Sequence, residues 1–88
     1  QYNEYKDNIV DIYEENKKEN ITIGCVNIKE SSSYTVYMVI VNNDNSYTNL
    51  LKNSFKDFTN SQSYFNELKS LIIKNDIDTI SKKILESF

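Results

Sequence analysis

The chain has 88 residues, a formal net charge of −3 and 39% hydrophobic residues, so we expect one small domain over residues 1–88, with a modest core and no interdomain cleft. It contains no histidine, arginine or proline, one glycine and one cysteine. This composition excludes histidine-based catalytic and metal sites, glycine-rich phosphate loops and an intramolecular disulfide. We therefore expect that the protein is not an enzyme and that it needs no cofactor or metal.

The excess of negative charge lies at the N-terminus, because residues 1–20 hold six acidic residues against three lysines and the remaining chain is balanced. The lysines adjoin one another only at positions 17–18 and 82–83. Phosphate binding needs clustered cations, so direct nucleic-acid binding is not expected. No apolar stretch approaches the length of a membrane span, about 18 residues, and no signal peptide is visible. These features exclude membrane insertion and favour a cytoplasmic location.

The first predicted element is a helix from Tyr2 to about Lys18. Its apolar residues are spaced three and four apart, as on one face of a helix: Tyr2, Tyr5, Ile9, Ile12 and Tyr13. The opposite face would then be acidic and would carry Glu4, Asp7, Asp11, Glu14 and Glu15. Such a face is either solvated surface or a docking face for a basic partner.

A β-hairpin is predicted next, from the β-branched runs 21–28 and 34–41 with three serines between them. In the second strand both faces are apolar, which favours a central strand or one covered on both sides. Gly24 interrupts the first strand and indicates a bulge or a close approach of another backbone. Cys25, inside an apolar run, is expected to be a buried, unreactive thiol.

Residues 42–45 (NNDN) form a predicted turn, and the segment after this turn has two interpretations. The spacing of the apolar residues from Tyr47 to Phe58 favours a helix. A third strand over residues 47–51, returning after the turn, is the alternative. The helical pattern is longer, so the helix is preferred.

Two further helices are predicted before the C-terminus. One would be capped by Thr59, Asn60 or Ser61 and end near residue 75, and the last would be capped by Asp76 or Asp78. The dipole and capping preferences explain these two aspartates better than a metal site does. The expected core is Ile9, Ile12, Ile23, Val36, Met38, Ile40, Leu51, Phe55, Leu68, Ile72, Ile80 and Ile84.

The predicted fold class is therefore α+β: an N-terminal helix, a β-hairpin with a third strand as the alternative, and two to three C-terminal helices packed on the sheet. We expect more than half of the residues to be helical.

The leading functional hypothesis is a non-enzymatic protein–protein interaction module. Tyr34 and Tyr37 point to opposite faces of the second strand, so one of them would stand on an open apolar patch unless helices cover both sides. A two-stranded sheet also leaves edges that can pair with another chain. The predicted partner-binding residues on this strand are Tyr34, Tyr37, Val39 and Val41. A homodimer formed through the same strand is one form of this hypothesis.

The alternative hypothesis is a small acidic inhibitor or immunity-type protein, for example of phage or mobile-element origin. It would place Glu4, Asp11, Glu14 and Glu15 in a basic site of a nuclease or another nucleic-acid enzyme. A net charge of −3 on a chain with ten lysines is a weak mimic of a polymer with one charge per ~1.7 Å of duplex axis. The interaction module is therefore favoured, and the salt dependence of binding separates the two hypotheses.

Overall fold

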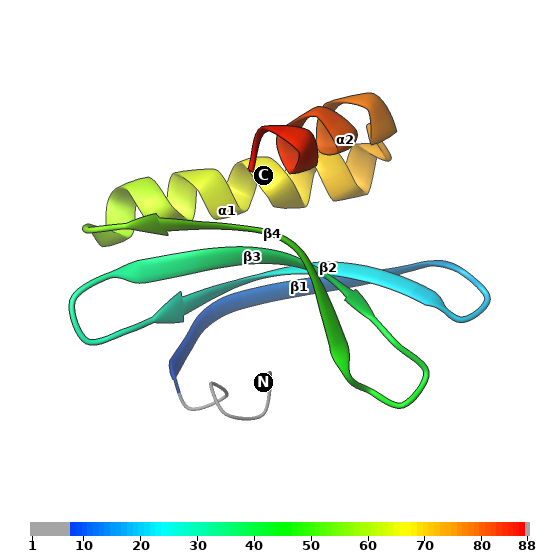
Figure 1. The fold of residues 1–88 in the computed structure, drawn as a ribbon, viewed down its shortest axis with the longest axis horizontal. Coiled ribbons are helices and arrows are strands. Elements are labelled where there is room, and N and C mark those ends of the chain that lie inside the picture. Colours follow the sequence, from blue (N-terminus) through cyan, green and yellow to red (C-terminus); the bar gives the residue numbers. More distant parts are fainter. Residues whose placement is uncertain (1–7, 88) are drawn as a thin grey trace.

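The computed structural model describes residues 8–87. Figure 1 shows an α+β fold in which four antiparallel strands form one sheet in the order β1-β2-β3-β4 and two helices come after them. The elements are β1 (Ile9–Lys18), β2 (Ile21–Lys29), β3 (Tyr34–Val41), β4 (Tyr47–Phe55), α1 (Phe58–Lys74) and α2 (Ile77–Glu86). The predicted α+β class is confirmed, but the predicted set of helices is wrong in two places.

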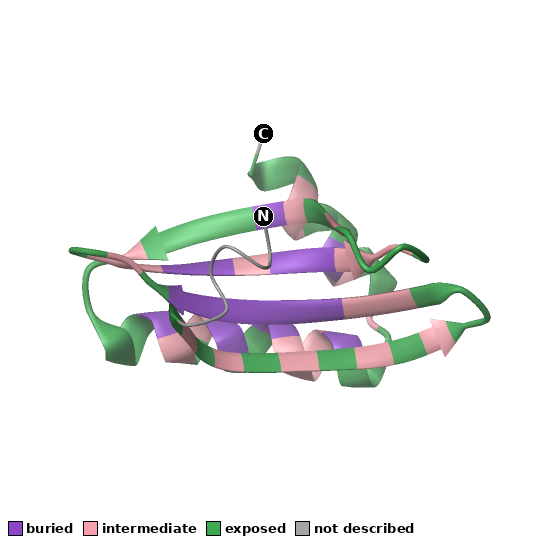
Figure 2. Ribbon diagram, turned by 90° about the horizontal axis from the view of Figure 1, so that it is seen from below, coloured by how far each residue is buried: buried purple, intermediate pink, exposed green. Residues whose placement is uncertain are grey.

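The predicted N-terminal helix is wrong, because Ile9–Lys18 forms the edge strand β1. Its residues alternate strictly between half-buried and exposed, as Figure 2 shows. Four of its first five residues are β-branched or aromatic, which favours a strand over a helix. The helical spacing depended on Tyr2 and Tyr5, which lie outside the described residues.

The predicted hairpin is confirmed. Strands β2 and β3 pair in continuous register from Thr22 opposite Val41 to Lys29 opposite Tyr34. Strand β3 lies between β2 and β4, so it is the central strand that its two apolar faces indicated.

The preferred helix over residues 47–58 is also wrong, and the alternative of a third hairpin strand describes this segment better. Strand β4 runs from Tyr47 to Phe55 and pairs with β3, with a register shift that leaves Leu50 as an extra residue. Pairing satisfies the backbone groups along the second edge of β3, which a helix would have left open. The two helices have 17 and 10 residues, so the expectation of a mostly helical chain is overturned.

The core lies between α1 and one face of the sheet. On α1, Phe65, Leu68 and Ile72 are completely buried at the three-and-four spacing of one helix face. They pack against Cys25, Val36, Met38, Leu51 and, from α2, Ile80. The structure buries six of the predicted core residues, namely Val36, Met38, Leu51, Leu68, Ile72 and Ile80, whereas Ile12 is 38% exposed because it lies on the other face of the sheet.

Polar side chains fix the start of α1 on the sheet. The amide nitrogen of Asn27, a completely buried residue of β2, donates to the Ser61 hydroxyl (3.0 Å) and to Gln62 Oε1 (3.2 Å). The Gln62 amide in turn donates to Asp11 on β1 (2.7 Å). Burying an amide costs free energy unless it is hydrogen bonded, so this network specifies where the helix sits.

The predicted N-terminal cap is wrong for α1 and confirmed for α2. Helix α1 begins at Phe58 after Asp57, so the predicted caps at residues 59–61 are wrong, and the Ser61 hydroxyl instead donates to the Phe58 carbonyl inside the helix. Helix α2 begins after Asp76, whose carboxylate accepts from the Thr79 backbone N–H. This confirms the capping role predicted for Asp76.

Candidate functional site

The structure separates the predicted partner-binding residues of β3. Tyr34 faces α1 and makes an edge-on ring contact with Phe58, with ring centroids 5.6 Å apart. Tyr37, Val39 and Val41 alternate with it and face the opposite side of the sheet, where Figure 1 shows no helix. Tyr34 is therefore a packing residue, and only the other three share a face.

That opposite side is curled into what we call the concave face, formed by residues of all four strands: Ile12, Glu14, Val26, Ile28, Thr35, Tyr37, Val39, Val41 and Tyr47. Val10 lies beside it near the start of β1, at the irregularity of this strand between Ile9 and Asp11. Tyr47 on β4 donates a hydrogen bond to Glu14 on β1, although these are the two outermost strands. In a flat sheet their backbones would lie about 14 Å apart, three strand spacings, so the contact requires strong curvature.

Burial on the concave face is uneven. Val26, Ile28 and Val39, on the two central strands, are each at most 3% exposed. By contrast, Val10 and Ile12 on β1 are 40% and 38% exposed. The accessible apolar surface of this face therefore lies mainly along β1. The buried side chains of the central strands, Val26, Ile28 and Val39, contribute little to it.

The edges of the sheet are poorly suited to strand addition. Both edges of β3 are paired, so the predicted use of its edge is wrong. The outer strand β1 has register irregularities near each end, and β4 has one beside Leu50. Such bulges, together with Lys17 and Lys18 on β1, are features that protect natural sheet edges from pairing with another chain.

The predicted acidic face does not exist among the described residues, and Glu4 lies outside them. Because β1 is a strand, Asp11 and Glu15 point toward α1 while Glu14 points to the concave face. Each has a partner: Asp11 accepts from Gln62, Glu14 from Tyr47, and Glu15 from Tyr13 and Lys17. The docking residues proposed for an acidic inhibitor are therefore divided between two surfaces.

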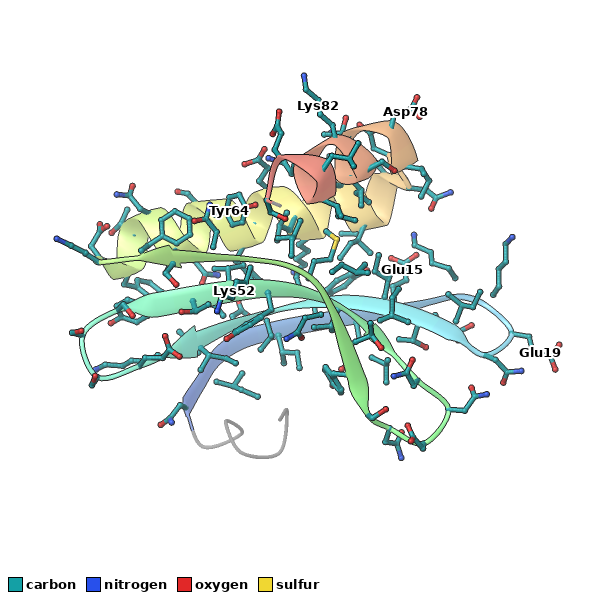
Figure 3. All side chains as sticks on the ribbon, viewed as in Figure 1. Glu15, Glu19, Lys52, Tyr64, Asp78 and Lys82 are labelled. Atoms are coloured by element: carbon teal, nitrogen blue, oxygen red, sulfur yellow. The ribbon has the colours of Figure 1, made fainter. Side chains whose placement is uncertain are left out.

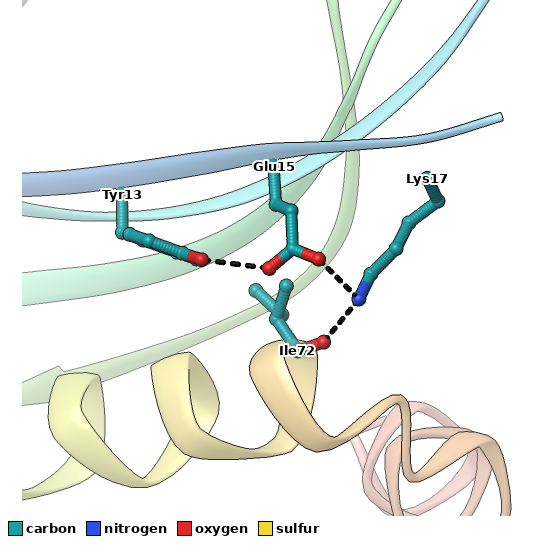
Figure 4. Close-up of polar contacts among 4 residues, drawn as sticks. All are labelled: Tyr13, Glu15, Lys17 and Ile72. Carbon is teal, nitrogen blue, oxygen red and sulfur yellow. Dashed lines mark hydrogen bonds and ion pairs between the residues drawn. The ribbon is translucent and has the colours of Figure 1, made fainter. Parts of the chain in front are cut away.

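A polar row on β1 contacts the end of α1, as Figure 4 shows. Tyr13 donates to Glu15 (2.7 Å), and the Lys17 ammonium bonds both Glu15 (2.8 Å) and the carbonyl of Ile72. Two hydrogen bonds lower the pKa of the Glu15 carboxyl, and the bond from Lys17 has a larger effect than the bond from Tyr13. The Lys17 charge at the helix C-terminus also suits the helix dipole, so this row attaches β1 to α1.

A pocket of about 360 Å³ opens beside this row, between the β1–β2 hairpin, β3 and the corner where α1 meets α2. We call it the isoleucine pocket, because six isoleucines line it: Ile21, Ile23, Ile40, Ile72, Ile77 and Ile80. Lys17, Lys18 and Asn75 complete the lining. The sequence analysis did not predict this pocket, because its lining residues come from five separate elements of the chain. Ile21 (44% exposed) and Ile77 (55% exposed) lie at its rim.

Cys25 is buried, as predicted, at 1% exposed, with its sulfur 4.0 Å from the carbonyl of Phe65. Burial raises the pKa of its thiol from 9.0 to about 12. A thiol with a raised pKa stays protonated at neutral pH and is therefore a poor nucleophile. The structure therefore gives Cys25 a packing role.

We expect the Cys25 thiol of the folded protein to resist Ellman's reagent at neutral pH and to react rapidly in denaturant, because only unfolding exposes the thiol and restores its ordinary pKa. The measurement is the absorbance time course of the released thiolate with and without urea. Rapid stoichiometric labelling of folded protein would show that Cys25 is accessible.

Within residues 8–87, no group of three or more Cys, Asp or Glu side chains is arranged to hold a metal ion, and Asp76 is engaged in capping α2. Asp78 lies on α2 with Lys82, on the side away from the sheet in Figure 3. Neither described helix is long and apolar enough to cross a membrane.

Comparisons with protein-family models, with curated proteins and with solved structures found no match to this chain.

Proposed function

We propose that this protein is a non-enzymatic protein-interaction module that binds its partner with the concave face of the sheet. The observation that carries the proposal is the exposure of Val10 and Ile12, two large apolar side chains of the edge strand β1. Ile12 lies on a face that carries no helix among residues 8–87, and Val26 of β2 lies between it and the half-buried Tyr37. Removing such side chains from water contributes about 25 cal/mol per Å² of apolar surface. A partner that covers them gains this free energy.

Binding through side-chain contacts on the concave face is better supported than binding by addition of a strand to a sheet edge. The register irregularities of β1 and β4 and the lysines of β1 weigh against pairing through an edge. The partner is expected to present apolar side chains that fit along β1 on the concave side. Glu14 and Tyr47 bond each other within the face and so leave one end of it polar.

An apolar contact predicts binding that tolerates salt, whereas docking of the acidic residues would weaken steeply as ionic strength rises. The acidic-inhibitor hypothesis receives no specific support, because Asp11, Glu14 and Glu15 are bonded within the protein and lie on two surfaces.

We expect Ile12→Asp to weaken partner binding at least about tenfold, or about 1.4 kcal/mol, because it places a carboxylate in the apolar contact. The measurement has two parts: sedimentation analysis of the purified chain for self-association, and affinity capture from source-cell extract at low and high salt. Ile73→Asp is the matched control, since Ile73 is 54% exposed on α1.

A complex that persists in high salt, survives Ile73→Asp and is lost with Ile12→Asp supports the proposal, and sedimentation shows whether the partner is a second copy. The proposal is overturned if the protein is a strict monomer without a partner at either salt. It is equally overturned if Ile12→Asp, shown to be folded by its melting curve, retains the partner.

A further inference from the structure

The isoleucine pocket lies on the helix side of the sheet, so it is separate from the concave face and independent of the function proposed for that face. Ile23 and Ile40 are cross-strand partners, while Ile72 and Ile80 are 0% and 5% exposed. Ile21 and Ile77 are far more exposed and form its rim. The pocket is thus a recess with buried and half-buried isoleucines in its wall and two exposed isoleucines at its opening.

The chemistry of the wall restricts what can bind there. Six of the nine lining residues are isoleucine, so most of the wall offers neither a hydrogen-bond donor nor an acceptor. The body of a ligand must therefore be hydrocarbon, because a polar group placed against this wall would lose its hydrogen bonds to water. A volume of about 360 Å³ lies within the ~300–1,000 Å³ range of small-molecule sites.

The polar residues of the pocket are Asn75 and two cations, Lys17 and Lys18. The Lys17 ammonium is held by Glu15 and by the Ile72 carbonyl. Lys18 is exposed, and among the described residues it has no ion-pair partner. Glu19, the nearest acidic residue in the chain, lies at the tip of the β1–β2 hairpin in Figure 3. Lys18 is therefore placed to meet a negative group beside the hydrocarbon recess.

From this combination we propose that the isoleucine pocket binds a single aliphatic chain with a carboxylate at one end, that is, a fatty acid of medium length. The chain lies against the isoleucines, and the carboxylate pairs with Lys18 at the rim. The hydrophobic contact supplies most of the affinity, and the exposed ion pair orients the ligand and adds a smaller part.

The test is a titration of the intact protein with monomeric decanoate, followed by the isoleucine methyl signals in NMR spectra and by calorimetry. Decanol, which has the same chain without the charge, and butyrate, which has the charge with a short chain, are the comparison ligands. We expect saturable decanoate binding with shifts confined to isoleucines of the pocket, weaker binding of decanol, and no saturation with butyrate.

Substitutions at the rim of the pocket and outside it show whether decanoate binds in the isoleucine pocket. Ile77→Asp should abolish decanoate binding, because it puts a carboxylate at the apolar rim, whereas Ile73→Asp, at an equally exposed position outside the pocket, should leave it unchanged. Lys18→Gln should weaken decanoate binding severalfold without affecting decanol. The proposal is overturned if decanoate shows no saturable binding, if Ile73→Asp weakens binding as much as Ile77→Asp does, or if Lys18→Gln affects both ligands equally.

Discussion

Replacing Phe65 by alanine is expected to destabilise the protein by about 3–5 kcal/mol, because the ring is completely buried at the centre of the contact between α1 and the sheet. The expected loss combines the transfer free energy of the ring with a cavity that the surrounding β-strands cannot fill by collapse. A domain of this size has a total stability of roughly 5–10 kcal/mol, so much of it would be lost. Urea denaturation followed by circular dichroism measures the change.

Phe58→Ala is the control, since Phe58 is 44% exposed at the start of α1, where its ring contacts that of Tyr34. Its expected cost is below about 1.5 kcal/mol, the upper range for an aromatic pair. Equal destabilisation by the two substitutions would contradict the assignment of Phe65 to the centre of the core.

Replacing Gly24 by alanine is expected to loosen β1 from the sheet and to cost roughly 1–3 kcal/mol, with a larger loss for valine. A Cβ atom at position 24 would lie 2.8 Å from the backbone oxygen of Tyr13 and 3.0 Å from the Cγ of Glu14. The Glu14 side chain can move, but the Tyr13 oxygen belongs to the paired strand and can shift only if the β1–β2 ladder shifts. Alanine would otherwise favour folding slightly, by reducing the entropy of the unfolded chain, so the backbone clash decides the sign.

Amide hydrogen exchange distinguishes this local effect from general destabilisation. In Gly24→Ala, protection should fall most along β1, while amides of β3 should follow global stability. Thr22→Ala serves as the control on the same strand and face, because Thr22 carries a side chain already and its hydroxyl accepts only an exposed bond from Asn16. A Gly24→Ala protein as stable as the original would refute the close approach of β1.

The candidate surfaces were less predictable than the secondary structure. The sequence indicated that Tyr37, Val39 and Val41 share a face, but it could not show that Val39 would be buried while Val10 and Ile12 stayed accessible. Val39 belongs to the central strand β3, whereas Val10 and Ile12 belong to the edge strand β1, and this strand order exists only in the folded sheet.

The sequence by itself determined those elements whose local pattern is unambiguous: the hairpin of β2 and β3, whose β-branched runs suit a strand, and α1, whose apolar residues fall on one helix face. The helix cap at Asp76 is also a local property.

Only the tertiary structure decided the state of residues 9–18 and 47–55, because their mixed apolar and polar patterns fit a helix or a strand. Strand β1 illustrates the reason: its face toward α1 carries Asp11, Glu15 and Lys17, which are stabilised by Gln62 and by the end of α1, residues more than fifty positions away in the chain. Backbone pairing with β2 and β3, together with these distant polar partners, outweighs local propensity at both edges of the sheet. The isoleucine pocket exists for the same reason, since its wall forms only when five elements meet.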